Sequence, residues 1–100
     1  MFPKAVREVL GFALYQAQMG NKHVQAKPLR GFGSGVLEVV SDHQGNTFRA
    51  VYTVRLGGRV YVLHVFQKKS KRGMATPKKD LELVMQRLRR AIEIHGAPEN

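Results

Sequence analysis

Two adjacent glycines, Gly57 and Gly58, constrain the fold of this chain more than any other feature of its sequence. They join two segments that are rich in β-branched and aromatic residues, FRAVYTVRL (48–56) and RVYVLHVFQ (59–67). A two-residue glycine connection between such segments is typical of a tight antiparallel hairpin, because glycine accepts the positive φ angles of the turn. The sequence therefore predicts two long antiparallel strands in the middle of the chain.

The hairpin also predicts which residues lie opposite each other. If residues 56 and 59 pair, Arg49 lies opposite about residue 66, and His64 lies opposite residue 51. Lys68 and Lys69 end the second strand, so we expect them at the same end of the sheet as Arg49. The residues that alternate with Arg49 are of modest size, and we expect its face of the sheet to be only partly covered.

The segment before the hairpin predicts a helix, a loop and a further strand. Residues 3–19 carry apolar residues at helical spacing, and Gly20 follows as a helix end. Residues 22–35 are interrupted by proline and glycine, which predicts a loop or a short helix. Residues 36–41 (VLEVVS) alternate as a strand, and the turn that follows is expected at Gly45-Asn46. The three strands together predict an antiparallel meander.

The segment after the hairpin predicts a second helix. Thr76 is expected to be its N-cap, Pro77 its first residue, and Asp80 lies in the first turn, where a negative charge suits the helix dipole. One apolar stripe follows, made of Leu81, Val84, Leu88 and Ile92. The whole pattern predicts a single α+β domain over residues 1–100, with an N-terminal helical segment, a curved antiparallel sheet and a C-terminal helix. We expect both helices to pack against one face of the sheet.

Composition excludes several kinds of site. The chain has no cysteine, so it has no disulfide, no thiolate nucleophile and no cysteine-ligated zinc. Its four histidines are far apart and show no ligand spacing, so we expect no metal and no small-molecule cofactor. Arg7 and Glu8 interrupt the first apolar stretch, so we expect neither a signal peptide nor a membrane span. We place the protein in the cytoplasm.

Positive charge is concentrated in the second half of the chain. The formal net charge is +10, and residues 49–90 carry twelve basic and only two acidic residues. Six of these cations lie between residues 68 and 79. Such a field attracts nucleic acid, an anionic membrane or an acidic protein, and nucleic acid is our first choice for a chain without a basic amphipathic helix at either end.

Clustered cations suit the chemistry of RNA cleavage. A 2′-hydroxyl attacks the adjacent phosphodiester when a base takes its proton, an acid protonates the leaving oxygen and cations stabilise the phosphoryl oxygens. A lysine among other cations is able to act as the base, because like charges lower its pKa. Solvation alone also explains a surface lysine run, and His64 is also explained as an ordinary sheet residue. Tyr52 and Tyr61 are interpreted as packing residues, although either ring is able to stack on a base.

Several motifs resemble the phage-derived, HigB-like branch of the RelE/ParE toxin superfamily, in order and with matching gaps. The resemblance extends from about Lys27 to Ala91. It rests on four motifs: Leu29-Arg30-Gly31, Phe48-Arg49-x-x-Tyr52, Leu63-His64-x-Phe66-x-Lys68-Lys69 and Thr76-Pro77-Lys78. It implies the same order of helix, curved sheet and helix. The resemblance also implies that the protein is the toxin of a type II toxin–antitoxin pair. Toxins of this branch cleave mRNA on the ribosome without a metal. A neighbouring antitoxin, commonly with a helix-turn-helix domain, silences such a toxin.

The resemblance implies roles for individual residues. Arg49 matches the sheet arginine that holds the scissile phosphate. Lys68 or Lys69 matches the basic residue that closes the following strand and stabilises the phosphate. Basic residues outside this centre are expected to bind RNA: Arg30, Lys71, Arg72, Lys78 and Lys79.

Two departures from RelE leave the general base open. Glu38 and Val40 stand where RelE has a lysine pair, and residues 73–75 (GMA) replace a tyrosine beyond the basic loop. His64 and Lys69 are the substitutes that we expect first. The departures also admit two other functions. One is a ParE-like toxin that acts on DNA gyrase without nuclease activity, and the other is a basic module that binds nucleic acid without catalysis.

Overall fold

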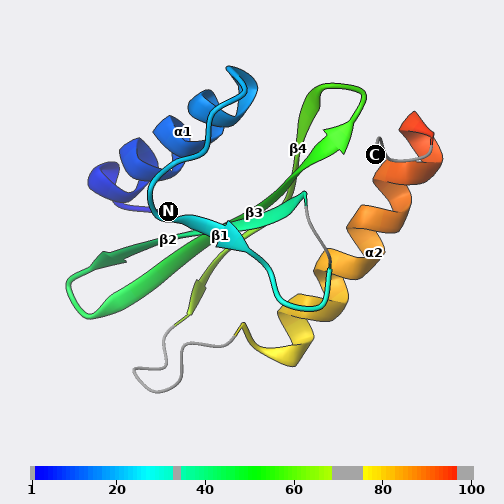
Figure 1. Cartoon of the computed structure of the whole chain (residues 1–100). Coiled ribbons are helices and arrows are strands. Elements are labelled where there is room, and N and C mark those ends of the chain that lie inside the picture. Colours follow the sequence, from blue (N-terminus) through cyan, green and yellow to red (C-terminus); the bar gives the residue numbers. More distant parts are fainter. Residues whose placement is uncertain (1, 33–34, 69–75, 97–100) are drawn as a thin grey trace.

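Two helices and four strands make up the described part of this computed structural model, residues 2–32, 35–68 and 76–96 (Figure 1). In chain order they are α1 (Lys4–Gln18), β1 (Ala26–Pro28), β2 (Val36–His43), β3 (Asn46–Leu56), β4 (Arg59–Lys68) and α2 (Lys78–His95). The strands form one antiparallel sheet in the order β1-β2-β3-β4. The predicted α+β fold, with a helix, an antiparallel sheet and a second helix, is confirmed.

The β3–β4 hairpin has the register that its glycine turn predicts. Leu56 pairs with Arg59, and Arg49 pairs with Phe66. Gly57 and Gly58 have φ angles of 65° and 72°, which few other residues adopt at low cost. The turn chemistry therefore determines which residues face each other at the far end of the two strands.

Two irregularities inside the hairpin cancel each other. Between Thr53 and Leu56, β3 contains one residue more than β4, and between Val51 and Tyr52, β4 contains the extra residue Leu63. A bulge of this kind redirects side chains, and here Leu63 and the neighbouring His64 both contact the α2 side of the sheet. The two shifts leave the pairing beyond them unchanged.

The two helices cover opposite faces of the sheet, so our expectation that both pack on one face was wrong (Figure 1). Side chains alternate along a strand, so adjacent residues such as Ala50 and Val51 belong to different faces. On the α1 face the buried cluster includes Val6, Leu10, Ala13, Ala17, Val39, Phe48, Ala50 and Tyr52. On the α2 face it consists of Leu29, Val36, Val51, Leu56, Leu63, Phe66, Val84 and Ala91.

The α2 face is fully covered at the centre of β3, contrary to our expectation. Arg49 and Thr53 are each 2% exposed, and Val51 between them is not exposed at all. The modest size of these residues leaves room for α2, which reaches the sheet through its apolar stripe. Small side chains on a strand thus indicate a close-packed helix here, and not an open surface.

Three local details also differ from the prediction. The segment predicted as a loop contains the short edge strand β1, which pairs with β2. The turn between β2 and β3 is made by Gln44 and Gly45, both with positive φ. Thr76 is not the N-cap of α2, because Pro77 holds that position and Thr76 instead bonds to the sheet.

Two tyrosines on β3 and β4 lie in different surroundings. Tyr52 is completely buried beneath α1, and within the described residues its hydroxyl has no hydrogen-bond partner. Burial raises the pKa of this phenol above its ordinary value. The Tyr61 hydroxyl, in contrast, lies 2.9 Å from Nδ1 of His95 near the end of α2.

We expect Tyr52→Phe and Tyr61→Phe to change stability in opposite directions. Tyr52→Phe removes a buried hydroxyl without a partner and should raise the free energy of unfolding by about 1 kcal/mol, whereas Tyr61→Phe loses a hydrogen bond and should lower it by about 1 kcal/mol. Urea denaturation of both variants measures the difference. A destabilised Tyr52→Phe protein would mean that the hydroxyl has a partner.

The glycine turn gives a second matched pair. Alanine at either Gly57 or Gly58 should cost about 1 kcal/mol, because both φ angles are positive. Gly57→Ala should cost more, since a Cβ there would overlap the His95 ring, whereas a Cβ at Gly58 meets no atom within 4 Å among the described residues. In a His95→Ala background the two variants should unfold at the same temperature, and a persisting gap would contradict the overlap.

Candidate nucleic-acid site

A cluster of three polar residues joins the sheet to the start of α2. Arg49 on β3 donates from Nη1 to Oε2 of Glu38 on β2 at 3.0 Å and to the hydroxyl of Thr76 at 3.2 Å. The Thr76 hydroxyl in turn donates to the same Oε2 at 2.6 Å. The three bonds form a closed triangle, which holds the Glu38 carboxylate and the Arg49 guanidinium in fixed relative positions.

The cluster follows from the alternation of the two strands. Glu38 pairs with Val51, and Arg49 pairs with Val40, so both charged side chains project from the α2 face one step apart. Arg49 lies almost entirely out of solvent, with 2% of its side chain exposed, and the Glu38 side chain is 13% exposed. Each charge stabilises the other at this depth, because removal of the counter-charge of a buried ion costs free energy.

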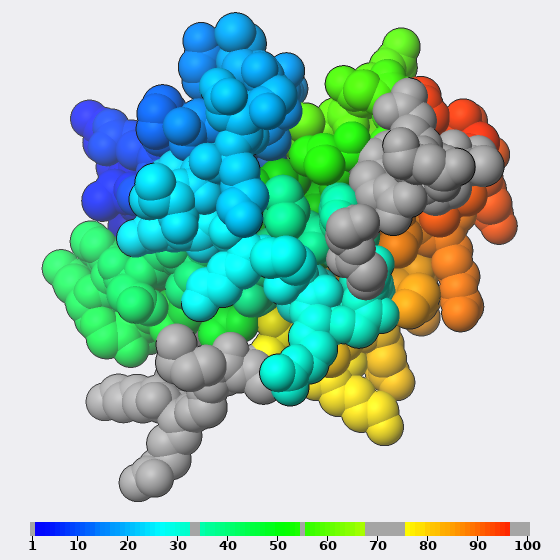
Figure 2. All heavy atoms as spheres, viewed as in Figure 1, coloured from blue at the N-terminus to red at the C-terminus, as the bar shows by residue number. Residues whose placement is uncertain are grey.

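A pocket of about 470 Å³ opens beside Glu38. Its lining combines apolar side chains with polar ones: Pro28, Leu29, Leu81, Lys27, Arg30, Glu38 and Thr76. Figure 2 shows residues near 30 (cyan) next to the first turns of α2 (yellow), the two segments that supply most of this lining. The size and the mixed lining are those of a small-molecule or nucleotide site.

The pocket is cationic at its exposed side. Lys27 is the cross-strand partner of Glu38, so their side chains project from the same face, and both Lys27 and Arg30 are exposed to solvent. Glu38 is the single carboxylate among the described residues that line this pocket. The described lining of the pocket therefore combines one carboxylate with two solvent-exposed cations.

His64 belongs to a second polar group on the same face. Its Nε2 lies 2.8 Å from Asp80 of α2, and its Nδ1 lies 3.0 Å from Nη1 of Arg87. Because a guanidinium only donates, Nδ1 is the acceptor, and Nε2 carries the proton that is donated to Asp80. Phe66 stacks on the ring with 4.7 Å between centroids. Both ring nitrogens therefore have partners within the fold, and the predicted role of His64 in catalysis stays a prediction.

The other predicted site residues are placed as follows. Lys68 ends β4 and pairs with Thr47, which puts its backbone at the same end of the sheet as Arg49. Lys78 and Lys79 are exposed in the first turn of α2, and Arg30 lines the pocket. The side chain of Lys68 lies outside the described part of the structure, as do three whole residues: Lys69, Lys71 and Arg72.

Arg49 faces inward, a position that the sequence comparison alone did not suggest. Its guanidinium contacts Glu38 and Thr76 and does not line the pocket. Its predicted contact with the scissile phosphate stays a prediction. The sequence did not predict that Glu38, Thr76 and Lys27 form a group. One signal was available, because an acid within the apolar segment VLEVV (36–40) indicates a cation nearby to compensate its burial.

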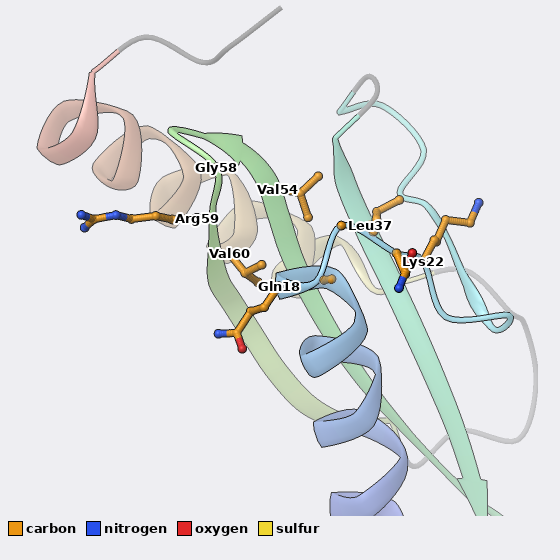
Figure 3. Close-up of a pocket in the computed structure, with 10 residues that line it drawn as sticks. Gln18, Lys22, Leu37, Val54, Gly58, Arg59 and Val60 are labelled. Carbon is orange, nitrogen blue, oxygen red and sulfur yellow. The ribbon is translucent and has the colours of Figure 1, made fainter.

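A second pocket, of about 400 Å³, lies on the other face of the sheet, between the end of α1 and the β3–β4 turn (Figure 3). Leu37, Val54 and Val60 give it an apolar interior. Arg59 points away from the other labelled residues in Figure 3. No carboxylate lines this pocket among the described residues.

The described residues contain no group of three or more His, Asp or Glu side chains that is arranged to hold a metal ion. In the same part of the chain, no helix has the length and apolar character needed to cross a membrane.

Because Arg49 and Glu38 form a buried ion pair beside the pocket, the free energy of unfolding should depend strongly on whether both charges are present. Arg49→Met removes the counter-charge of the buried Glu38 carboxylate, and Glu38→Leu removes the carboxylate that Arg49 binds. Each substitution alone should lower the free energy of unfolding by about 3–5 kcal/mol. The double variant removes both charges and should recover most of that loss. Chemical denaturation measures this cycle, and Arg90→Met, which removes an exposed partner of Glu93, is the control. A double variant no more stable than the single ones would contradict the pairing.

The comparisons with known proteins identify the family of the chain. Residues 1–89 match the family model described as Phage derived protein Gp49-like (DUF891). The comparison with curated proteins and the comparison with solved structures gave no match. The matched residues include α1, the four strands and the three residues of the polar cluster, Glu38, Arg49 and Thr76. The chain belongs to this Gp49-like family of phage-derived proteins, which is a RelE-like toxin family.

Proposed function

We propose that the protein is the toxin of a type II toxin–antitoxin pair of the HigB-like branch, and that it cleaves mRNA on the ribosome without a metal ion. The observation that carries this proposal is the pocket that Glu38 lines together with the exposed cations Lys27 and Arg30. A carboxylate and cations in one pocket are the groups that metal-independent RNA cleavage requires. Family membership is consistent with a toxin.

The distribution of charge supports a ribosomal target. The chain carries a net charge of +10, and twelve of its 17 cations fall within residues 49–90, which include β3, β4 and α2. Several of these cations, such as Lys78 and Lys79, are exposed beside the pocket face. An excess of positive charge of this kind accelerates the encounter with RNA and lowers its dissociation at physiological salt.

The family also suggests an antitoxin as partner. We propose that this antitoxin is encoded next to the toxin and carries a helix-turn-helix domain. An acidic segment of the antitoxin would suit a toxin with only seven acidic residues against 17 basic ones. Such a partner would bind the same basic surface that otherwise attracts ribosomal RNA.

Induction of the wild-type protein should arrest translation within minutes, and mapping of mRNA 5′ ends should reveal cuts at defined codon positions. Cleavage in a purified translation system should persist when a chelator selective for transition metals is added at constant Mg²⁺, because the ribosome keeps its Mg²⁺ and no metal takes part in the cleavage step. Lys68→Ala with Lys69→Ala should slow cleavage by about tenfold or more, since it removes two cations from the strand end. Arg89→Ala with Arg90→Ala changes the net charge equally on the exposed surface of α2 and is the control.

Two results would contradict this function in different ways. DNA damage signalling without loss of mRNA would favour a ParE-like toxin that acts on gyrase. Binding to any RNA or DNA that weakens steeply with salt, with no defined products, would favour a basic module without catalysis.

A further inference from the structure

We propose that Glu38 is the general base of this RNA cleavage, that Lys27 and Arg30 hold the phosphate in the pocket, and that Arg49 positions Glu38 without touching the substrate. This inference rests on the proposed nuclease function and assigns the base that the sequence left open. It assigns the base to the pocket beside β1 and β2, in place of His64 and Lys69, the two candidates expected from the sequence.

Glu38 has the orientation that a base needs. Both hydrogen bonds of its side chain within the described residues end on Oε2, one from Arg49 and one from Thr76. The second oxygen, Oε1, is left to accept a proton, and the residue lines the pocket with 13% of its side chain exposed. A carboxylate fixed by two donors on one oxygen stays in place while the other oxygen reacts, which is what orientation contributes to catalysis.

His64 meets these requirements less well than Glu38. Both of its nitrogens are engaged, one with Asp80 and one with Arg87, so it has no free acceptor for a substrate proton. It also does not line the pocket that contains the exposed cations. His64 instead connects β4 to α2.

Stability alone gives no reason for a charged pair at these two positions. A buried ion pair is on balance no more stable than well-packed apolar residues of the same volume, because both charges lose their hydration. Here the pair forms at the edge of a 470 Å³ pocket and not in a closed core. The buried Arg49 keeps the carboxylate in one position, and the exposed cations are left to contact the ligand.

The cleavage step follows from this arrangement. Oε1 of Glu38 accepts the proton of a ribose 2′-hydroxyl while the 2′-oxygen forms a bond to the adjacent phosphorus. Lys27 and Arg30 stabilise the charge on the non-bridging oxygens. The bond from phosphorus to the 5′-oxygen breaks, and that oxygen takes a proton from water. The products are a 2′,3′-cyclic phosphate and a 5′-hydroxyl, with the proton from the 2′-hydroxyl left on Glu38 until it passes to solvent.

The test is single-turnover cleavage of mRNA on ribosomes in a purified translation system, with the full-length toxin variants. Glu38→Gln should lower the rate at saturating ribosomes by about 100-fold or more, with the half-saturating concentration unchanged. Thr76→Val removes one donor to Oε2 and should lower the same rate by about tenfold, again without a change in half-saturation. Glu82→Gln, an exposed acid of α2 that does not line the pocket, should have no effect.

Substitution of the two pocket cations should change the half-saturating concentration, in contrast to the substitutions above, which change the rate at saturation. Lys27→Ala with Arg30→Ala should raise the half-saturating concentration by about tenfold and reduce its dependence on salt, because it removes phosphate contacts. Lys4→Ala with Lys22→Ala changes the net charge by the same amount on the α1 side and should leave both parameters unchanged.

A folding defect must be separated from a catalytic one. Circular dichroism melting of each variant measures folding, and Glu38→Asp keeps the charge and the ion pair while it withdraws the carboxylate from the pocket. If Glu38→Asp is folded and cleaves within threefold of the wild type, as does Glu38→Gln, the inference is wrong while the nuclease function stands. Products with 5′-phosphate ends would also overturn it. A wild-type protein that cuts no mRNA would overturn both the inference and the proposed function.

Discussion

The buried ion pair between Arg49 and Glu38, closed by Thr76, is the interaction on which the rest of the α2 face depends. Three hydrogen bonds connect Glu38 on β2, Arg49 on β3 and Thr76, which lies just before Pro77 and α2. Two of these bonds end on Oε2 of Glu38. Apolar contacts along α2 determine how close the helix lies to the sheet, but they allow sliding, because they have no direction. The polar triangle has direction and so determines where α2 begins relative to the strands.

The covering of both sheet faces explains how a small chain holds two charges so deeply. α1 packs on one face and α2 on the other, so the central strand β3 is removed from water on both sides. Tyr52 and Arg49, three residues apart, are both buried, although they point to opposite faces.

The features that the sequence predicted correctly are those that local chemistry determines. The Gly57-Gly58 turn sets the register of the hairpin, and apolar spacing identifies both helices and three of the four strands in the described residues. The features that it did not predict depend on pairing across long stretches of chain. β1 is only three residues long and forms because β2 offers an edge, and the Glu38–Thr76 bond joins residues 38 positions apart. Helical periodicity identifies the apolar side of a helix but does not tell which face of the sheet it covers.

The ion pair also determines what a loss of activity at Arg49 can mean. A substitution of Arg49 removes a candidate phosphate contact and the counter-charge of the buried Glu38. It also removes the bond between Arg49 and Thr76. Loss of activity would follow from any of these three effects. The exposed residues Lys27 and Arg30 do not have this ambiguity, because neither forms an ion pair with a buried group among the described residues. In a fold of this size, a residue that maintains the structure and a residue that binds the substrate are distinguished by burial more reliably than by sequence position. The assignment of the reaction should therefore begin from the exposed lining of the pocket and proceed inward to Glu38.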